Sequence, residues 1–109
     1  MPRLQRPPKS FQEFVRRFPK LGRAWELLSE AAEEAGPLDE KTQRLVKLAI
    51  ALGSRQEGAV HSGVRKAVAA GATREELEQV VAAAASLIGL PATVMVYQWV
   101  REEAEKRPH

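Results

Sequence analysis

The sequence predicts an all-α fold, and two observations carry that prediction. Signals that begin and end helices recur along the chain, whereas no stretch shows the apolar–polar alternation that is typical of strands. The chain has no internal repeat, and its 109 residues, 44% apolar and 28% charged, match one ordinary globular domain. We expect a disordered Pro/Arg-rich arm over residues 1–9 and a single helical domain over residues 10–109.

The first helix is predicted to be short, from Ser10 to Pro19, because Ser10 and Glu13 have the spacing of a capping box. A longer helix follows from about Leu21 and ends at the Gly36–Pro37 dipeptide. Its apolar residues recur at steps of three and four, which predicts one buried face made of Ala24, Trp25, Leu28, Ala31, Ala32 and Ala35.

Asp39 is a suitable N-cap for the third predicted helix, which Gly53 ends. Its predicted buried face comprises Leu45, Leu48, Ala49 and Leu52. The next helix, over about residues 56–70, contains Gly58 and Gly63, and each costs roughly 1 kcal/mol relative to alanine in an exposed helix interior. We therefore expect a neighbouring helix or a ligand to approach the backbone closely there.

The boundary between the fourth and fifth predicted helices carries three separate signals. Gly71 ends the fourth helix. Thr73 and Glu76 have the spacing of a capping box for the fifth, and Ala72 with Leu77 can form the hydrophobic staple around it.

The uncharged stretch from Val80 to Val100 approaches the length of a membrane span, but Gly89 and Pro91 interrupt it. We therefore expect two shorter buried helices joined by a turn, and no membrane partner. The second would run from about Ala92 to Glu105 and end in solvent, because its composition becomes charged after Val100.

Composition excludes several function classes. The chain has no cysteine, so disulfides, thiolate catalysis and thiolate metal sites are excluded. The net charge of +3 comes from interspersed charges of both signs, which is typical of a soluble protein. Residues 1–10 contain three prolines and no apolar run, so we expect no signal peptide and a cytoplasmic location. The N-terminal stretch is basic, but it has no motif of a nucleic-acid-binding domain and no cluster of aromatic side chains on which bases could stack. A nucleic-acid partner is therefore not expected.

His61 is the main candidate for proton transfer, since the other histidine, His109, is the terminal residue. Glu57, His61 and Arg65 follow one another at four-residue spacing and would share one helix face. Catalytic roles for His61 and Glu57 and substrate binding by Arg65 are one interpretation; a surface row of favourable helical pairs is the other. We predict no metal site and no cofactor, because one internal histidine with scattered carboxylates lacks a metal-ligand spacing.

Four segments carry a family resemblance over roughly residues 20–105. They are residues 38–53 (LDEKTQRLVKLAIALG), 57–61 (EGAVH), 64–67 (VRKA) and 70–77 (AGATREEL). In this combination the chain resembles the carboxymuconolactone decarboxylase and alkylhydroperoxidase D (AhpD-like) superfamily. The resemblance implies an all-helical subunit of about five to six helices that assembles as a homotrimer or homohexamer.

The chemistry of the alkylhydroperoxidase D branch does not carry over. That branch uses a Cys-x-x-Cys pair, a histidine four residues later and an upstream glutamate. When residues 64–67 are aligned with that branch, Gln56 and Ala59 stand at the two cysteine positions and approximately Arg44 stands at the glutamate position. Gly63 stands at the histidine position, and the decarboxylase branch also has a histidine there. His61 lies two residues from position 63, a turn of about 200° around a helix, so it would need a pocket of its own.

Two hypotheses of function stay open on the sequence. One is a cofactor-free lyase or isomerase acting on a small organic acid, with Glu57 as orienting partner or base for His61 and Arg65 attracting the carboxylate. The other is a non-catalytic oligomeric scaffold or binding protein that has lost the family active site. An active pocket should hold His61 partly buried in contact with Glu57, whereas a scaffold should leave this row in solvent.

Overall fold

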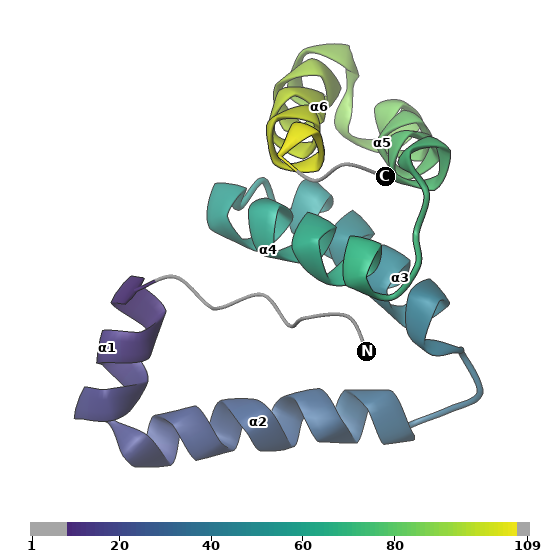
Figure 1. Cartoon of the computed structure of the whole chain (residues 1–109). Helices are drawn as coiled ribbons and strands as arrows, with labels where there is room; N and C mark the ends of the chain where they lie inside the picture. Colours follow the sequence, from purple (N-terminus) through teal and green to yellow (C-terminus); the bar gives the residue numbers. More distant parts are fainter. Residues whose placement is uncertain (1–8, 107–109) are drawn as a thin grey trace. The chain divides into compact units, whose positions relative to one another are not determined.

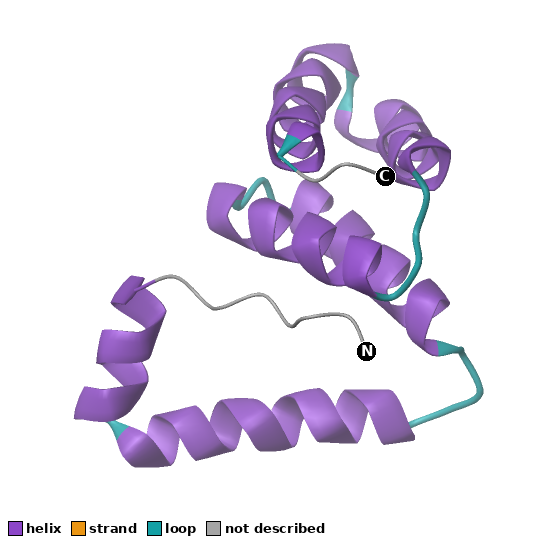
Figure 2. Cartoon of the chain, viewed as in Figure 1, coloured by secondary structure: helices purple, strands orange, loops and turns teal. Residues whose placement is uncertain are grey.

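The fold is all-α, as predicted, in a computed structural model that describes residues 9–106 (Figure 2). Its six helices are α1 (Lys9–Arg17), α2 (Pro19–Glu34), α3 (Glu40–Gly53), α4 (Glu57–Ala69), α5 (Arg74–Ile88) and α6 (Leu90–Glu105). Over these residues no strand is present. Of the predicted N-terminal arm, residues 1–8 lie outside the described part, and Lys9 begins α1, so Ser10 lies inside that helix.

The helices group into two compact units, residues 1–38 and residues 39–109. In the first, α1 contacts α2. In the second, α3 contacts α4 and α5, and α6 contacts α4 and α5, so four helices close around a common core (Figure 1). The single domain expected over residues 10–109 stays a prediction.

In the first unit, α1 and α2 cross closely where Val15 meets Gly22. A Cβ atom added at Gly22 would lie 3.1 Å from the Val15 Cβ atom, so the glycine permits this approach. The Phe11 and Trp25 rings also meet edge to face, with centroids 5.4 Å apart. No residue of α2 is buried, and the predicted buried face is wrong for this unit, because two helices alone cannot enclose a side chain.

The second unit contains the hydrophobic core. Its largest fully buried side chains are Leu48, Leu52, Leu77, Val60, Val64, Val96 and Val100. Asp39 caps α3 as predicted, because its side chain accepts a hydrogen bond of 2.8 Å from the backbone N–H of Thr42. Ala49 was expected on the buried face of α3 but is exposed.

The turns of this unit follow the sequence signals. Gly71 has a φ of 100°, the left-handed conformation that glycine adopts at little cost. Both hydrogen bonds of the capping box between Thr73 and Glu76 are present. Ala72 and Leu77, the residues predicted to form the staple, are buried on either side of it.

Gly63 and Gly58 have different surroundings within α4. A Cβ atom at Gly63 would lie 3.1 Å from Leu48 Cδ1 and 3.4 Å from Leu48 Cα, so α3 and α4 pack closely there. At Gly58 the same atom would meet nothing within 4 Å. Helix packing therefore explains Gly63 and does not explain Gly58.

The last two helices are separated at Gly89, whose φ of 86° breaks the helical path. α6 begins directly afterwards, with Pro91 in its first turn, two residues earlier than predicted. None of the described helices is both long and apolar enough to span a membrane.

Candidate functional site

Helix α4 brings Glu57, His61 and Arg65 to one face, as their spacing predicts. The His61 Nε2 atom lies 3.6 Å from Glu57 Oε2. The His61 side chain is 19% exposed, whereas that of Glu57 is 58% exposed. The imidazole is thus partly buried and lies beside Glu57, as expected of a pocket, whereas Glu57 itself is mostly exposed, as expected of a surface row.

The partner that holds His61 is Glu103 of α6, a residue the sequence analysis did not single out. Glu103 is only 2% exposed. Its Oε1 atom lies 2.8 Å from His61 Nδ1, and it also faces Arg65 Nη1 and Lys106 Nζ, each at 3.6 Å. A buried carboxylate is costly unless it is paired, and here three basic side chains surround the same oxygen.

The Glu103 contact determines which nitrogen of His61 faces the pocket. An ionised carboxylate can only accept hydrogen bonds, so we assign the proton to Nδ1, which donates to Glu103. In the neutral ring Nε2 then carries a lone pair. The orienting role expected of Glu57 therefore belongs to Glu103, while Glu57 lies at the opposite nitrogen.

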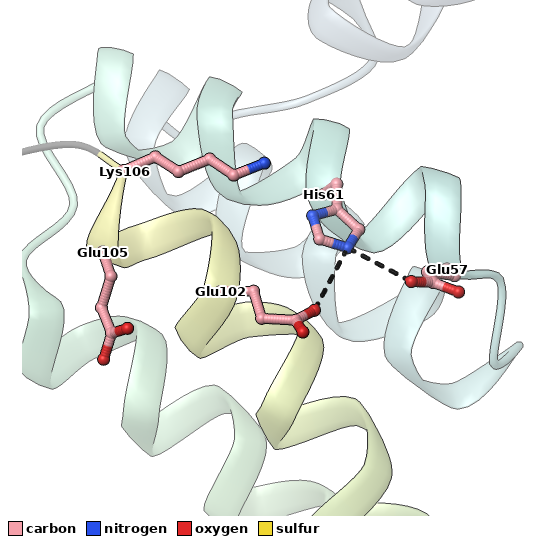
Figure 3. Close-up of a pocket in the computed structure, with 5 residues that line it drawn as sticks. All are labelled: Glu57, His61, Glu102, Glu105 and Lys106. Atoms are coloured by element: carbon pink, nitrogen blue, oxygen red, sulfur yellow. Dashed lines mark ion pairs between the residues drawn. The ribbon is translucent and has the colours of Figure 1, made fainter.

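An open pocket lies against His61 between α4 and α6 (Figure 3). Its lining residues are Glu57, His61, Glu102, Glu105 and Lys106. The carboxylates of Glu57 and Glu102 both point toward the Nε2 side of the ring, whereas that of Glu105 points away from it. Arg65 does not line this pocket, since its guanidinium lies beside Glu103 instead.

A positively charged region adjoins the site through Arg65. The neighbouring Lys66 has a lowered pKa, chiefly because it is partly buried and then because of the charges of Arg44, Lys47 and Arg65. The charge along this side of α4 therefore changes from acidic near Glu57 to basic near Arg65.

Glu102 and Glu103 were expected in solvent because they belong to the charged end of the last helix. That expectation is wrong for Glu103. The sequence did contain a signal for its burial. Steps of four and three residues lead from Val96 to Val100 and on to Glu103, so Glu103 lies on the same buried face of α6 as the two valines. No comparable signal places Glu102 beside His61, since 41 positions separate them and only the packing of α4 against α6 joins them.

Comparisons with known proteins agree with this architecture. An uncharacterized protein of Haemophilus influenzae is 38% identical over 59 residues, which are 54% of this chain and 52% of that protein. The chain therefore spans about half the length of this relative. The apo crystal structure of a carboxymuconolactone decarboxylase family protein from Legionella pneumophila has a TM-score of 0.78 at 27% identity, over 88% of this chain and 86% of that one.

The sequence model of the carboxymuconolactone decarboxylase family matches residues 19–102, which include five of the six helices in whole or in large part. The match includes Glu57, His61 and Arg65 and stops one residue before Glu103. With its all-helical fold and a solved structural neighbour in the same family, this cysteine-free chain belongs to the carboxymuconolactone decarboxylase family.

Proposed function

We propose that the chain is a cofactor-free lyase or isomerase that moves a proton on a small organic acid, with His61 as the general acid and base. The single observation that carries this proposal is the 2.8 Å contact between His61 Nδ1 and the buried Glu103 Oε1. A carboxylate behind one imidazole nitrogen fixes the ring and stabilises the imidazolium that forms when the other nitrogen takes a proton.

In the proposed reaction Nε2 removes a proton from a carbon next to a carboxylate and returns it elsewhere on the same molecule or to a leaving group. Glu57, 3.6 Å from Nε2, is the second group of the pocket that can accept or deliver a proton. Glu103 does not exchange the proton; it holds the ring so that Nε2 faces the pocket.

The acidic group of the substrate requires a cation near the imidazole. Arg65 supplies positive charge from the Nδ1 side of the ring, where its Nη1 atom lies 3.6 Å from Glu103 Oε1. Lys106 lines the pocket and supplies a second positive charge. We therefore propose that Lys106, which lines the pocket, contacts the carboxylate of the substrate, and that Arg65 attracts the same carboxylate from its position beside Glu103.

Exchange of carbon-bound hydrogen in D2O tests this function without knowledge of the substrate. A panel of small carboxylic acids is incubated with metal-free protein, and loss of each C–H signal is followed by proton NMR. Wild-type protein should catalyse exchange in at least one acid, and His61→Gln should abolish it. Arg65→Gln should raise KM more than it lowers kcat. The matched control is His109→Gln, which removes the other histidine and should exchange as the wild type does.

Catalysis that persists at the wild-type rate in a folded His61→Gln variant would rule out this assignment. Complete lack of exchange across the panel would favour the second candidate, a non-catalytic oligomeric scaffold or binding protein. That candidate is supported by large apolar side chains exposed on the second unit, which include Val46, Ile50, Leu87, Leu90, Val94 and Met95.

The same apolar side chains support self-association under either candidate. Val46 and Ile50 are one helical turn apart on α3, and Leu87 and Leu90 flank the turn at Gly89. Exposed apolar patches of this kind mark protein interfaces more often than free surface. We propose a homotrimer or homohexamer.

A further inference from the structure

Three potential ligand atoms converge at the pocket face of His61, one from the imidazole and two from carboxylates. Nε2 lies 3.6 Å from Glu57 Oε2 on α4 and 4.0 Å from Glu102 Oε1 on α6. The ligand atoms of all three residues lie within 4.8 Å of one another. Figure 3 shows both carboxylates directed at the same ring nitrogen from different helices.

This convergence is unfavourable unless a cation lies between the three atoms. The proton on Nδ1 is directed to Glu103, so a neutral ring presents its Nε2 lone pair to two negative charges. Across residues 9–106, Glu57 and Glu102 each have His61 as their only ion-pair partner. Either a proton on Nε2 or a bound metal ion relieves the repulsion.

The separations suit a small divalent ion after a modest adjustment. Zn²⁺ binds nitrogen and oxygen at about 2.0–2.2 Å, which places tetrahedral ligands about 3.3 Å apart, so the widest pair must close by at most about 1.5 Å. The Glu57 and Glu102 side chains are 58% and 48% exposed, so rotation about their own bonds can supply this movement. Water would complete the coordination.

A second observation, separate from the acidic pair, also favours a metal ion. Metal-bound histidines characteristically donate their other ring N–H to a carboxylate, which fixes the tautomer and makes the ligand nitrogen more basic. The contact between His61 Nδ1 and Glu103 has this geometry, and Glu103 is held by its burial and its basic neighbours. Imidazole nitrogen as one of three ligands favours a transition metal over Mg²⁺, which prefers oxygen.

We propose that Glu57, His61 and Glu102 form a binding site for a divalent transition-metal ion, for which Zn²⁺ is the probe. The ion and a transferred proton compete for the same Nε2 lone pair. If His61 transfers protons as proposed above, bound Zn²⁺ should inhibit that transfer; this part of the inference rests on the proposed function. The binding itself does not depend on catalysis.

Isothermal titration of the tag-free, full-length protein with ZnCl2 tests the site directly, with MgCl2 as the comparison ion. We expect one Zn²⁺ per chain and much weaker binding of Mg²⁺. His61→Gln should abolish the binding. Glu57→Gln and Glu102→Gln should each weaken it by at least about tenfold, because even residues that only contact a metal ligand contribute about 10–100-fold.

Glu105→Gln is the matched control for charge. It removes a carboxylate from the same pocket, but Glu105 is not one of the three converging residues. This variant and His109→Gln should bind Zn²⁺ as the wild type does. Circular dichroism establishes that each variant is folded; if His61→Gln does not fold, the comparison of Glu102→Gln with Glu105→Gln decides.

Three results would overturn the site: no Zn²⁺ binding, binding that persists in a folded His61→Gln variant, or equal weakening by Glu105→Gln and Glu102→Gln. Equal weakening would show a diffuse negative field rather than a coordination site. The hydrogen-exchange assay of the proposed function uses metal-free protein, so absence of zinc binding would not contradict that function. Absence of hydrogen exchange would likewise not contradict zinc binding seen in the titration.

Discussion

Glu103 Oε1 on α6 lies 2.8 Å from His61 Nδ1 on α4, and this contact joins two helices at the site. It explains why a carboxylate occupies a position that continues the buried valine face of α6. The same contact turns Nε2 toward the pocket. Stability and proposed function therefore depend on the same pair of residues.

Glu103→Gln should destabilise the protein by about 1–3 kcal/mol, because a buried hydrogen bond to a charged group is replaced by a neutral one. Arg65 and Lys106 would also lose the negative charge that they face. Urea unfolding followed by circular dichroism measures this loss. Glu102→Gln is the matched control. Because the Glu102 side chain is about half exposed, this variant should change the free energy of unfolding by no more than about 0.5 kcal/mol. Equal effects of the two variants would contradict the distinct role given to Glu103.

Gly63→Ala should lower the free energy of unfolding by about 1–3 kcal/mol more than Gly58→Ala does, because it adds a methyl group to a well-packed contact. At Gly63 the new Cβ atom would meet Leu48 Cδ1 at 3.1 Å and the Leu48 backbone at 3.4 Å. At Gly58 it would meet nothing within 4 Å, so alanine should be neutral or stabilising by up to about 1 kcal/mol. Thermal unfolding of both variants measures the difference. A Gly63→Ala protein as stable as Gly58→Ala would show that the α3–α4 contact is looser than described.

Glu76 should make stability depend on pH in the acid range. Its pKa is lowered, first by the hydrogen bond from the Thr73 backbone N–H at 2.8 Å and then by the Lys41 ammonium at 2.9 Å. A pKa that is lower in the folded state stabilises the protein above the ordinary glutamate value, and this stabilisation is lost as the pH falls through the folded value. Glu76→Gln should therefore lower the urea midpoint at pH 7, and its difference from the wild type should shrink as the pH falls below the ordinary glutamate pKa.

Glu75→Gln is the control for this prediction, since Glu75 lies in the same first turn of α5 and has no ion-pair partner among the described residues. It removes the same charge from the helix start without the contacts to Thr73 and Lys41. A pH dependence that is the same for both variants would mean that the helix start, rather than these contacts, determines the effect.

Self-association should depend on the exposed apolar side chains. Sedimentation velocity should give a species several times heavier than the 12.1 kDa chain. Ile50→Lys and Leu87→Lys each place a charge on an exposed apolar position and should shift the protein toward the monomer. Gln79→Lys, at an exposed polar position of α5, should leave the distribution unchanged. A monomeric wild type, or variants that sediment as the wild type does, would contradict the proposed assembly.

The all-α fold was predictable from local signals that act within a few residues. Asp39 with Thr42, and Thr73 with Glu76, satisfy helix-start N–H groups regardless of the rest of the chain. Gly71 and Gly89 adopt the positive φ values that end helices. The buried face of α2 was wrong because periodicity shows that a helix has an apolar face but does not show what covers it.

Half of the candidate site followed from helix geometry, and half did not. Glu57 and His61 share a face because four residues make about one helical turn. Glu103 was predictable in principle, since it continues the face of Val96 and Val100, but its charge suggested solvent. Glu102 reaches His61 only through the packing of α6 against α4, a contact between distant segments that no local pattern encodes.

The most direct test of this account is the tautomer of His61 in the folded protein, measured by long-range proton–nitrogen NMR on 15N-labelled protein at a pH above the titration of the ring. Glu103 should hold the proton on Nδ1, so Nδ1 should show the protonated nitrogen shift and Nε2 the unprotonated one. A proton on Nε2 in the neutral ring would contradict the account, because the nitrogen assigned to proton transfer and metal binding would then have no lone pair facing the pocket.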